Sequence, residues 1–190
     1  MKNEIKNGSK MNVVKSFFGH LCTITRHRHA VMSNCFKCGI AWRGLMHDLS
    51  KYGPTEFWRG VKYYQGGKRS PNAREKELFG YSVAWFHHKG RNRHHWEYWY
   101  DYSSKSALYE PIEMPRKFLI EMFCDRVAAS KVYKGKDYTD SSALEYYKAR
   151  NEADFIHPVT AQKLEFLLSM LAEKGEKETF AYIRKNRKTL

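Results

Sequence analysis

A carboxylate lies within the apolar stripe of one predicted helix, and this feature restricts the possible folds more than any other. Between about Met114 and Gly135, apolar side chains recur every three or four residues, and Asp125 occupies one of these positions. A buried carboxylate without a partner is costly, so the fold must supply a cation, an arginine or a proton. Arg126 points to a different side of the same helix. The sequence therefore predicts a metal ion, or a basic residue distant in sequence, beside Asp125.

Helical periodicity dominates the rest of the chain. Helices are predicted over about 10–29, 35–49, 55–65, 73–89, 142–152 and 159–173, and a basic amphipathic segment starts near 178. No period-two alternation stands out, so strands are not expected. We expect an all-α fold, in which residues 1–9 form a flexible lead and residues 10–190 form one helical domain of about six to eight helices.

Composition indicates a globular protein with anionic partners. Hydrophobic residues make up 42% of the chain, and 34 Lys and Arg against 20 Asp and Glu give a net charge of +14. This charge favours nucleotides, nucleic acid or an anionic surface as partners. With no signal peptide or membrane span evident, we expect a soluble cytoplasmic protein with no membrane partner, and its four cysteines to be reduced. Cys35 and Cys38 have CxxC spacing but lack a second ligand pair, so buried or half-buried thiols are expected.

Two further features carry candidate metal ligands. His47 and Asp48 are adjacent near the end of the predicted helix 35–49, and an imidazole nitrogen and a carboxylate oxygen both suit divalent transition metals. In the first predicted helix, His27 continues an apolar stripe that includes Leu21 and Ile24. His27 should therefore point into the core together with Asp125.

These residues together resemble a known superfamily. A histidine on one helix, an adjacent His-Asp pair followed by Lys51, and an aspartate on a later helix are similar to the pattern of the HD-domain superfamily of metal-dependent phosphohydrolases. The strings RGLMHDLSKYGPTEF, GYSVAWFHHKGRNRHHWEYW and EMFCDRVAASKVYKGKDY also resemble an uncharacterised family of HD-like proteins from bacteria and their phages. This resemblance implies an HD-like helical bundle that holds one or two divalent metals, with Mn, Fe, Co, Ni, Zn and Mg not distinguished.

The resemblance also implies roles for individual residues. The metal ligands would be His27, His47, Asp48 and Asp125, with His87 and His88 as additions that would convert one metal site into two. His27 and His47 lie closer in sequence than is usual in the superfamily, so His20 is the alternative first ligand. Asp48 and Lys51 would be catalytic, and the substrate would be contacted by Lys51, Arg91, Arg93, His94 and His95.

The segment from His87 to Tyr102 has alternative interpretations. Its basic first half, HHKGRNRHH, can be a solvated loop, or its histidines can cap helices and stack on Trp96 and Trp99. The aromatic second half is typical of core packing and subunit contact, which allows a homo-oligomer. At least one of these histidines is expected to contact metal or substrate.

The sequence leads to three hypotheses of function. The first is a metal-dependent phosphohydrolase that acts on a nucleotide or another small phosphorylated molecule, in which the metal lowers the pKa of bound water and polarises the phosphoryl oxygens. Glu56, Glu97 or a histidine would act as general acid or base. The second is an HD-like di-iron oxygenase that uses the same ligands. The third is a basic nucleic-acid-binding protein with a structural or vestigial metal site.

Overall fold

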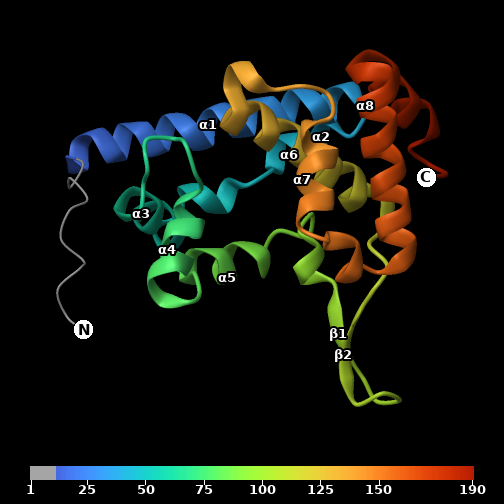
Figure 1. Cartoon of the computed structure of the whole chain (residues 1–190), viewed down its shortest axis with the longest axis horizontal. Coiled ribbons are helices and arrows are strands. Elements are labelled where there is room, and N and C mark those ends of the chain that lie inside the picture. Colours follow the sequence, from blue (N-terminus) through green and yellow to red (C-terminus); the bar gives the residue numbers. More distant parts are fainter. Residues whose placement is uncertain (1–11) are drawn as a thin grey trace.

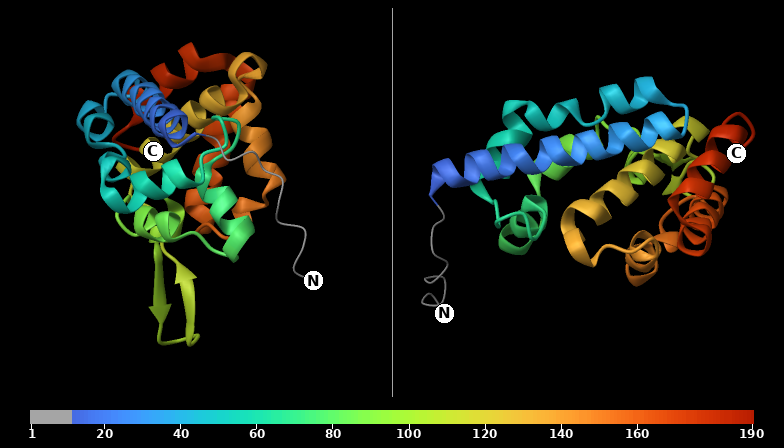
Figure 2. Two further views of the ribbon diagram at one scale, coloured as in Figure 1. Left: turned by 90° about the vertical axis from the view of Figure 1, so that its left-hand side faces the viewer. Right: turned by 90° about the horizontal axis from the view of Figure 1, so that it is seen from above.

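Helix α1 (Val13–Lys37) runs along almost the whole length of the molecule (Figures 1 and 2). The computed structural model describes residues 12–190, so the predicted lead at 1–9 lies outside the described residues. Asn12 caps α1, because its side-chain oxygen accepts a hydrogen bond from the Val14 amide at 2.9 Å. The prediction that this helix ends near His29 is wrong. Buried side chains recur along one face as far as Asn34 and Cys35, so the helix continues to Lys37.

The segment after α1 turns back on it. Gly39 has a positive φ of 75°, which ends the helix, and α2 (Ala41–Met46) then packs against α1. The expected helix 35–49 is therefore much shorter than predicted, because its first residues belong to α1. The 3-10 helix η1 (Leu49–Tyr52) follows, and Pro54 is the first residue of α3 (Pro54–Lys62).

The predicted helix 73–89 is two helices, α4 (Pro71–Phe79) and α5 (Val83–Lys89). Gly80 takes a left-handed conformation with φ 80° and ends α4. Ser82 then begins α5, since its hydroxyl accepts a hydrogen bond from the Trp85 amide at 3.0 Å. The break changes the direction of the chain and so determines where the end of α5 lies.

A small β-hairpin, which the sequence did not predict, projects from the helical body (Figure 1). Strands β1 (Tyr100–Ser103) and β2 (Leu108–Pro111) are antiparallel, with Tyr100 opposite Pro111 and Ser103 opposite Leu108. The 3-10 helix η2 (Trp96–Tyr98) precedes it. Each strand has only four residues, so alternation along the sequence is too short to be recognised.

The C-terminal half is helical. Helix α6 (Arg116–Lys134) matches its prediction and is followed by η3 (Gly135–Asp137), α7 (Ser142–Ala149), η4 (Glu152–Asp154) and α8 (Pro158–Asn186). Gly175, with φ 75° and ψ 175°, kinks α8 between the two segments that the sequence predicted there. With eight α-helices and one hairpin in residues 12–190, the structure confirms the predicted all-α class.

The core has two parts on either side of the candidate site. The larger part joins the end of α1 to α6, α7 and α8, and includes Phe123, Leu164 and Leu168. The smaller part, between α1 and α3, consists of Ile24, Phe57 and Val61. His27 lies between these parts on α1, since Ile24 and Val31 flank it on the same buried face. Polar residues are thus placed at the centre of the molecule.

Side-chain burial agrees with two other expectations. Cys35 and Cys38 are buried free thiols, and the sulfur of Cys38 lies 3.6 Å from that of Cys124. Trp96 and Trp99 are partly buried against the larger core. Within residues 12–190, every helix is too short or too polar to cross a lipid bilayer.

Candidate metal centre

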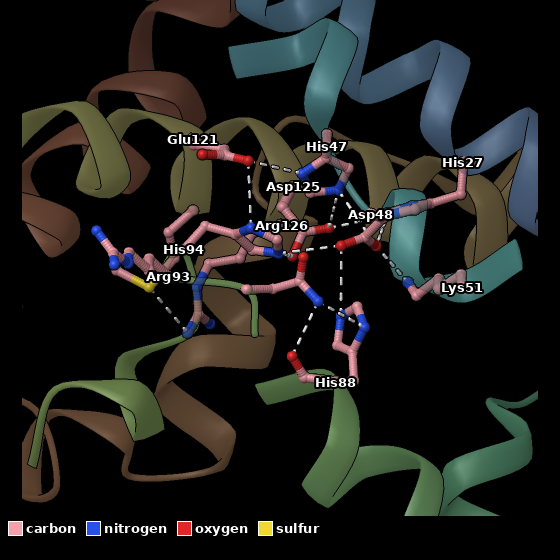
Figure 3. Close-up of polar contacts among 12 residues, drawn as sticks. His27, His47, Asp48, Lys51, His88, Arg93, His94, Glu121, Asp125 and Arg126 are labelled. Atoms are coloured by element: carbon pink, nitrogen blue, oxygen red, sulfur yellow. Dashed lines mark hydrogen bonds and ion pairs between the residues drawn. The ribbon is translucent and has the colours of Figure 1, made fainter. Parts of the chain in front are cut away.

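Five segments bring histidines and carboxylates to one buried point (Figure 3). His27 comes from α1, Asp125 from α6, and the pair His47–Asp48 from the junction between α2 and η1. His88 lies on α5, and His94 and His95 lie in the loop that follows it. Asp48 is at the middle of this group, which we call the histidine-aspartate cluster: His27, His47, Asp48, His88, His94, His95 and Asp125.

The backbone at Asp48 has an unusual conformation that aims its side chain. Its φ of 53° and ψ of 26° are left-handed, a region that aspartate tolerates better than most residues. The preceding His47 ends α2 with φ −58° and ψ 130°. This change of backbone direction between neighbours allows both side chains to face the same buried point, although they are adjacent in sequence.

The two carboxylate oxygens of Asp48 face different histidines. Its Oδ2 lies 3.3 Å from His47 Nε2 and 3.9 Å from His27 Nε2. Its Oδ1 lies 3.4 Å from His88 Nε2 and 3.3 Å from His94 Nε2. Asp48 therefore stands between two groups of imidazoles, one on each oxygen.

Asp125 lies beside His27 and His47, the two histidines near Oδ2 of Asp48. Asp125 Oδ1 lies 2.9 Å from His27 Nε2 and 3.8 Å from His47 Nε2, and its Oδ2 lies 3.9 Å from His94 Nε2. The prediction from its place in the apolar stripe was that it would need a basic partner or a metal. The structure puts three imidazoles around it.

Several potential ligand atoms are buried and make no hydrogen bond of regular geometry, since their nearest polar neighbours are one another and Lys51. This holds for both oxygens of Asp48 and for Nε2 of five histidines, at positions 27, 47, 88, 94 and 95. Burying so many polar atoms together without regular hydrogen bonds is unfavourable unless something binds them. Convergent imidazole nitrogens and carboxylate oxygens are a donor set that divalent transition metals accept, so the residues fit a metal ion.

Three subsets have ligand atoms that all lie within 4.8 Å of one another. They are Asp48 with His88, His94 and His95; His27 with His47 and Asp48; and His47 with His94 and Asp125. Asp48 belongs to two of these subsets. The cluster can therefore hold a metal ion.

Two further carboxylates hold the histidines from behind. Glu121, on α6, is buried, and its Oε1 lies 3.0 Å from His47 Nδ1 and 3.2 Å from His94 Nδ1. Arg43 donates to its other oxygen at 2.7 Å. A histidine that donates a hydrogen bond from Nδ1 to a carboxylate presents the lone pair of Nε2 to a metal.

Glu56, on α3, positions a histidine of α5 in the same way. Its Oε2 lies 2.7 Å from His88 Nδ1, and its Oε1 lies 2.7 Å from His87 Nδ1. Asn92 also contacts His88, with its amide nitrogen 3.1 Å from the same Nδ1. Both oxygens of Glu56 are thus engaged, which fixes the ring of His88.

The electrostatics of the cluster favour a cation. Burial lowers the pKa of His47, but the carboxylates of Asp48, Glu121 and Asp125 outweigh it and raise the pKa to about 10. Burial alone would raise the pKa of Asp48 and Asp125, yet the surrounding histidines, and Lys51 beside Asp48, bring both well below their usual range. Because these carboxylates stay ionised, a metal that displaces the protons of the histidines would meet full negative charges.

The other predicted site residues lie in different places. Lys51 is at the edge of the cluster, with its ammonium 2.5 Å from Asp48 Oδ2. His87 contacts Glu56 and belongs to none of the subsets found within residues 12–190. Arg91 is exposed, and Arg93 is also exposed, with its guanidinium 5.6 Å from the centre of the Tyr98 ring.

Sequence reasoning assigned some residues to other roles. His94 and His95 were expected to contact substrate but lie among the potential metal ligands, whereas His20 is outside the cluster. Glu121 was missed, although it precedes Asp125 by one helical turn and so shares its face. His94 and His95 lie in an irregular loop, where periodicity gives no indication of direction.

The fold and the cluster define a mostly helical protein with a buried group of histidines and carboxylates that can bind metal. A model of a family of unknown function, DUF5662, matches residues 16–170, and the chain belongs to that family. The match runs from α1 into the first part of α8 and includes every residue of the histidine-aspartate cluster. No curated protein and no solved structure matches the chain.

Proposed function

We propose that the histidine-aspartate cluster holds two divalent metal ions that share Asp48, and that the protein is a phosphohydrolase of small phosphorylated molecules. One observation carries this proposal: the two carboxylate oxygens of Asp48 face different histidines. A carboxylate whose two oxygens face separate groups of imidazoles is suited to bridge two cations. His27, His47 and Asp125 would complete one site, and His88 and His94, with His95, the other.

Phosphoester hydrolysis is the chemistry that such a pair of ions serves best. Two bound divalent ions activate a water molecule and stabilise the charges that develop on phosphoryl oxygens. The fixed imidazoles and carboxylates of the cluster would keep the coordinating atoms in place, since Glu121 and Glu56 hold three of the rings. The resemblance to HD-domain phosphohydrolases supports the same reaction class.

Lys51 provides a cation beside this centre. Its side chain is 27% exposed, so it can reach both the cluster and a bound molecule. Burial alone would lower the pKa of Lys51, but the carboxylates of Asp48 and Asp125 raise it above its usual value, which keeps the amine charged. When metals neutralise Asp48, the ammonium becomes available to a phosphate oxygen.

Elemental analysis and phosphate release test the proposal together. The full chain, loaded in turn with Mn, Zn, Co or anaerobic Fe(II), is expected to bind close to two ions and to hydrolyse p-nitrophenyl phosphate. Asp48→Asn and Asp125→Asn keep the side-chain volume. Asparagine at position 48 also tolerates the left-handed backbone conformation. Both variants should lose at least about 100-fold in activity.

The matched control is Asp137→Asn, at an exposed position in η3, which should leave metal content and activity unchanged. Circular dichroism should show that all three variants keep their helices. A protein that binds no metal in any preparation would contradict the proposal. Oxygen consumption with iron and no phosphate release would indicate a di-iron oxygenase, and salt-sensitive nucleic-acid binding that survives Asp48→Asn would indicate a binding protein.

A further inference from the structure

A small cavity adjoins the histidine-aspartate cluster. Its volume is about 60 Å³, and Lys51 and Glu56 form the part of its wall nearest the cluster. Lys51 pairs with Asp48, and Glu56 holds the metal-facing His88. Each of these two residues thus contacts a potential ligand as well as the cavity. A molecule bound at the metals would therefore have this space within its reach.

His20 contributes an unsatisfied polar group to the cavity. The residue is 6% exposed, and its Nδ1 is buried with no hydrogen-bond partner. The ring is fixed on its other side, because a Cβ added at Gly60 would collide with it. Burial, followed by the charge of Lys51, lowers the pKa of His20 to about 4, so the imidazole is neutral at physiological pH. A neutral imidazole can either donate or accept one hydrogen bond at Nδ1.

The rest of the polar wall is also uncharged. Ser70, Asn72 and Tyr133 provide two hydroxyls and an amide, which can donate and accept hydrogen bonds. The one cation and one carboxylate that line the cavity are already paired with cluster residues. The lining therefore does not favour a second anion, and it suits a neutral group with several hydroxyls.

The size of the cavity restricts the group further. An apolar cavity that accommodates benzene in another protein has a volume of about 150 Å³. The present cavity, at about 60 Å³, is too small for a nucleobase. Two or three hydroxyl-bearing carbons are a better match to this space.

From these observations we infer that the cavity binds the hydroxylated carbon chain of the substrate, and that the substrate is the phosphate ester of a small polyol or sugar. Vicinal hydroxyls would exchange hydrogen bonds with His20, Ser70 and Asn72 while the phosphate lies at the metals beside Lys51. This inference rests on the proposed phosphohydrolase for the position of the phosphate. The cavity itself discriminates between alcohols by their hydroxyl groups.

A pair of non-hydrolysable ligands tests the cavity separately from the reaction. The probes are 3,4-dihydroxybutylphosphonate and butylphosphonate, which differ only in the two hydroxyls. Calorimetry with the Zn-loaded full chain should give at least about 10-fold tighter binding of the dihydroxy compound, which corresponds to about 1.4 kcal/mol. In a parallel NMR titration, the signals of the His20 imidazole should shift with the dihydroxy compound and not with butylphosphonate.

Asn72→Leu removes a polar wall and fills part of the space at a half-buried position in the first turn of α4. It should abolish the preference for the dihydroxy compound over butylphosphonate. Asn186→Leu is the matched control, since Asn186 lies near the end of α8 and does not line the cavity. Equal binding of the two probes by the wild type, or a preference that Asn72→Leu retains, would overturn the inference.

The hydrolysable pair separates the two proposals. Glycerol 3-phosphate and propyl phosphate should both release phosphate, with a higher kcat/KM for glycerol 3-phosphate. If neither is hydrolysed and the binding preference remains, the phosphohydrolase is wrong and the hydroxyl-binding cavity is supported. If both are hydrolysed equally well, the reverse conclusion holds.

Discussion

Two buried glutamates determine which nitrogen each histidine presents. Glu121 contacts the Nδ1 atoms of His47 and His94, and Glu56 contacts that of His88. Burial would raise the pKa of Glu121, but hydrogen bonds from these two histidines lower it to about 2. Glu121 therefore remains a carboxylate and an acceptor, with its charge also paired to Arg43. It acts on the metal site as a positioning residue, through the histidines.

Replacing Glu121 tests this role. Glu121→Gln keeps the shape but removes the charge, so the two imidazoles are held less firmly and their Nε2 atoms become weaker ligands. We expect metal affinity to fall by about 10- to 100-fold with the fold retained. A competition titration with a chromophoric chelator measures the affinity. Glu113→Gln is the control, since Glu113 is exposed and pairs only with Lys163 among the described residues. Equal affinities for both variants would argue against the role.

His20 makes stability depend on pH. Its folded pKa of about 4 lies below its ordinary value of 6.5, so the unfolded chain binds a proton more readily between these values. The metal-free protein should therefore lose stability as the pH falls from about 6.5 to 4. His20→Leu removes this contribution. Between pH 7 and 4.5, the wild type should lose about 2 kcal/mol more than the variant in urea unfolding.

The control for this measurement is His29→Leu, because His29 is on the same helix and exposed. It should show the pH dependence of the wild type. If His20→Leu behaves like the wild type as well, the imidazole of His20 is not buried in a neutral form.

Helical phase accounts for the cluster residues that the sequence predicted. His27 and Asp125 continue apolar stripes, so each is expected on the helix face that packs against the core. His94 and His95 could not be placed in this way, because their direction depends on a loop that bends back toward α6. The exclusion of His87 depends on the short α5, whose last turn directs His88 to Asp48 and the adjacent His87 to Glu56.

At the scale of elements, close packing of α2 on α1 places the pair His47–Asp48. A Cβ added at Gly44 would lie 2.8 Å from Cys35 Cβ and 3.0 Å from Met32 Cα, so no larger residue fits there without movement. Gly44 precedes His47 by less than one helical turn. A change in the distance between α1 and α2 would therefore move His47 and Asp48.

Gly44→Ala should separate α2 from α1. We expect a loss of stability of about 1 to 3 kcal/mol, together with weaker metal binding, because His47 and Asp48 move with α2. Denaturant unfolding and metal titration measure the two effects. Gly80→Ala is the control: it has open space around its Cβ but a positive φ of 80°, so it should destabilise by about 1 kcal/mol and leave metal affinity unchanged. Unchanged metal binding in Gly44→Ala would show that α2 can shift without its ligands.

The errors in the predicted helix boundaries have a common cause. Glycines 39 and 80 end helices by adopting positive φ, and glycine in a sequence does not reveal which conformation it takes. The hairpin is a similar case. Its turn uses Ala107 at φ 56°, where glycine or asparagine would have indicated a turn. Long amphipathic helices such as α6 were predictable because their pattern extends over many turns.

In the whole molecule, the cluster lies between two separate cores. The smaller core contains Ile24, Phe57 and Val61, and the larger one is built around α6 and α8. Ligands from α1, α2, α5 and α6 would tie these parts together when metal is bound. Metal binding and cohesion of the fold are therefore expected to be linked.

Removal of metal should loosen the smaller core first. Saturating metal at 1,000 times its dissociation constant adds about 4 kcal/mol to the stability of the folded state. A chelator should therefore lower the melting temperature and increase amide hydrogen exchange in α3 and α5 more than in α6 and α8. Exchange measured by mass spectrometry with and without metal tests this. The Asp48→Asn variant should resemble the metal-free protein in both conditions, and a uniform change over all helices would contradict the proposed linkage.

The continuity of α1 has one more consequence. His20, at the cavity, and His27, at the cluster, are on one uninterrupted helix, so their separation along its axis is fixed at roughly 10 Å by the rise of 1.5 Å per residue. The helix therefore sets the distance that a substrate must span between the cavity and the metal ions. An ester whose hydroxyls are too near its phosphorus, or too far from it, cannot satisfy both ends, and chain length would then be selected by the backbone of α1.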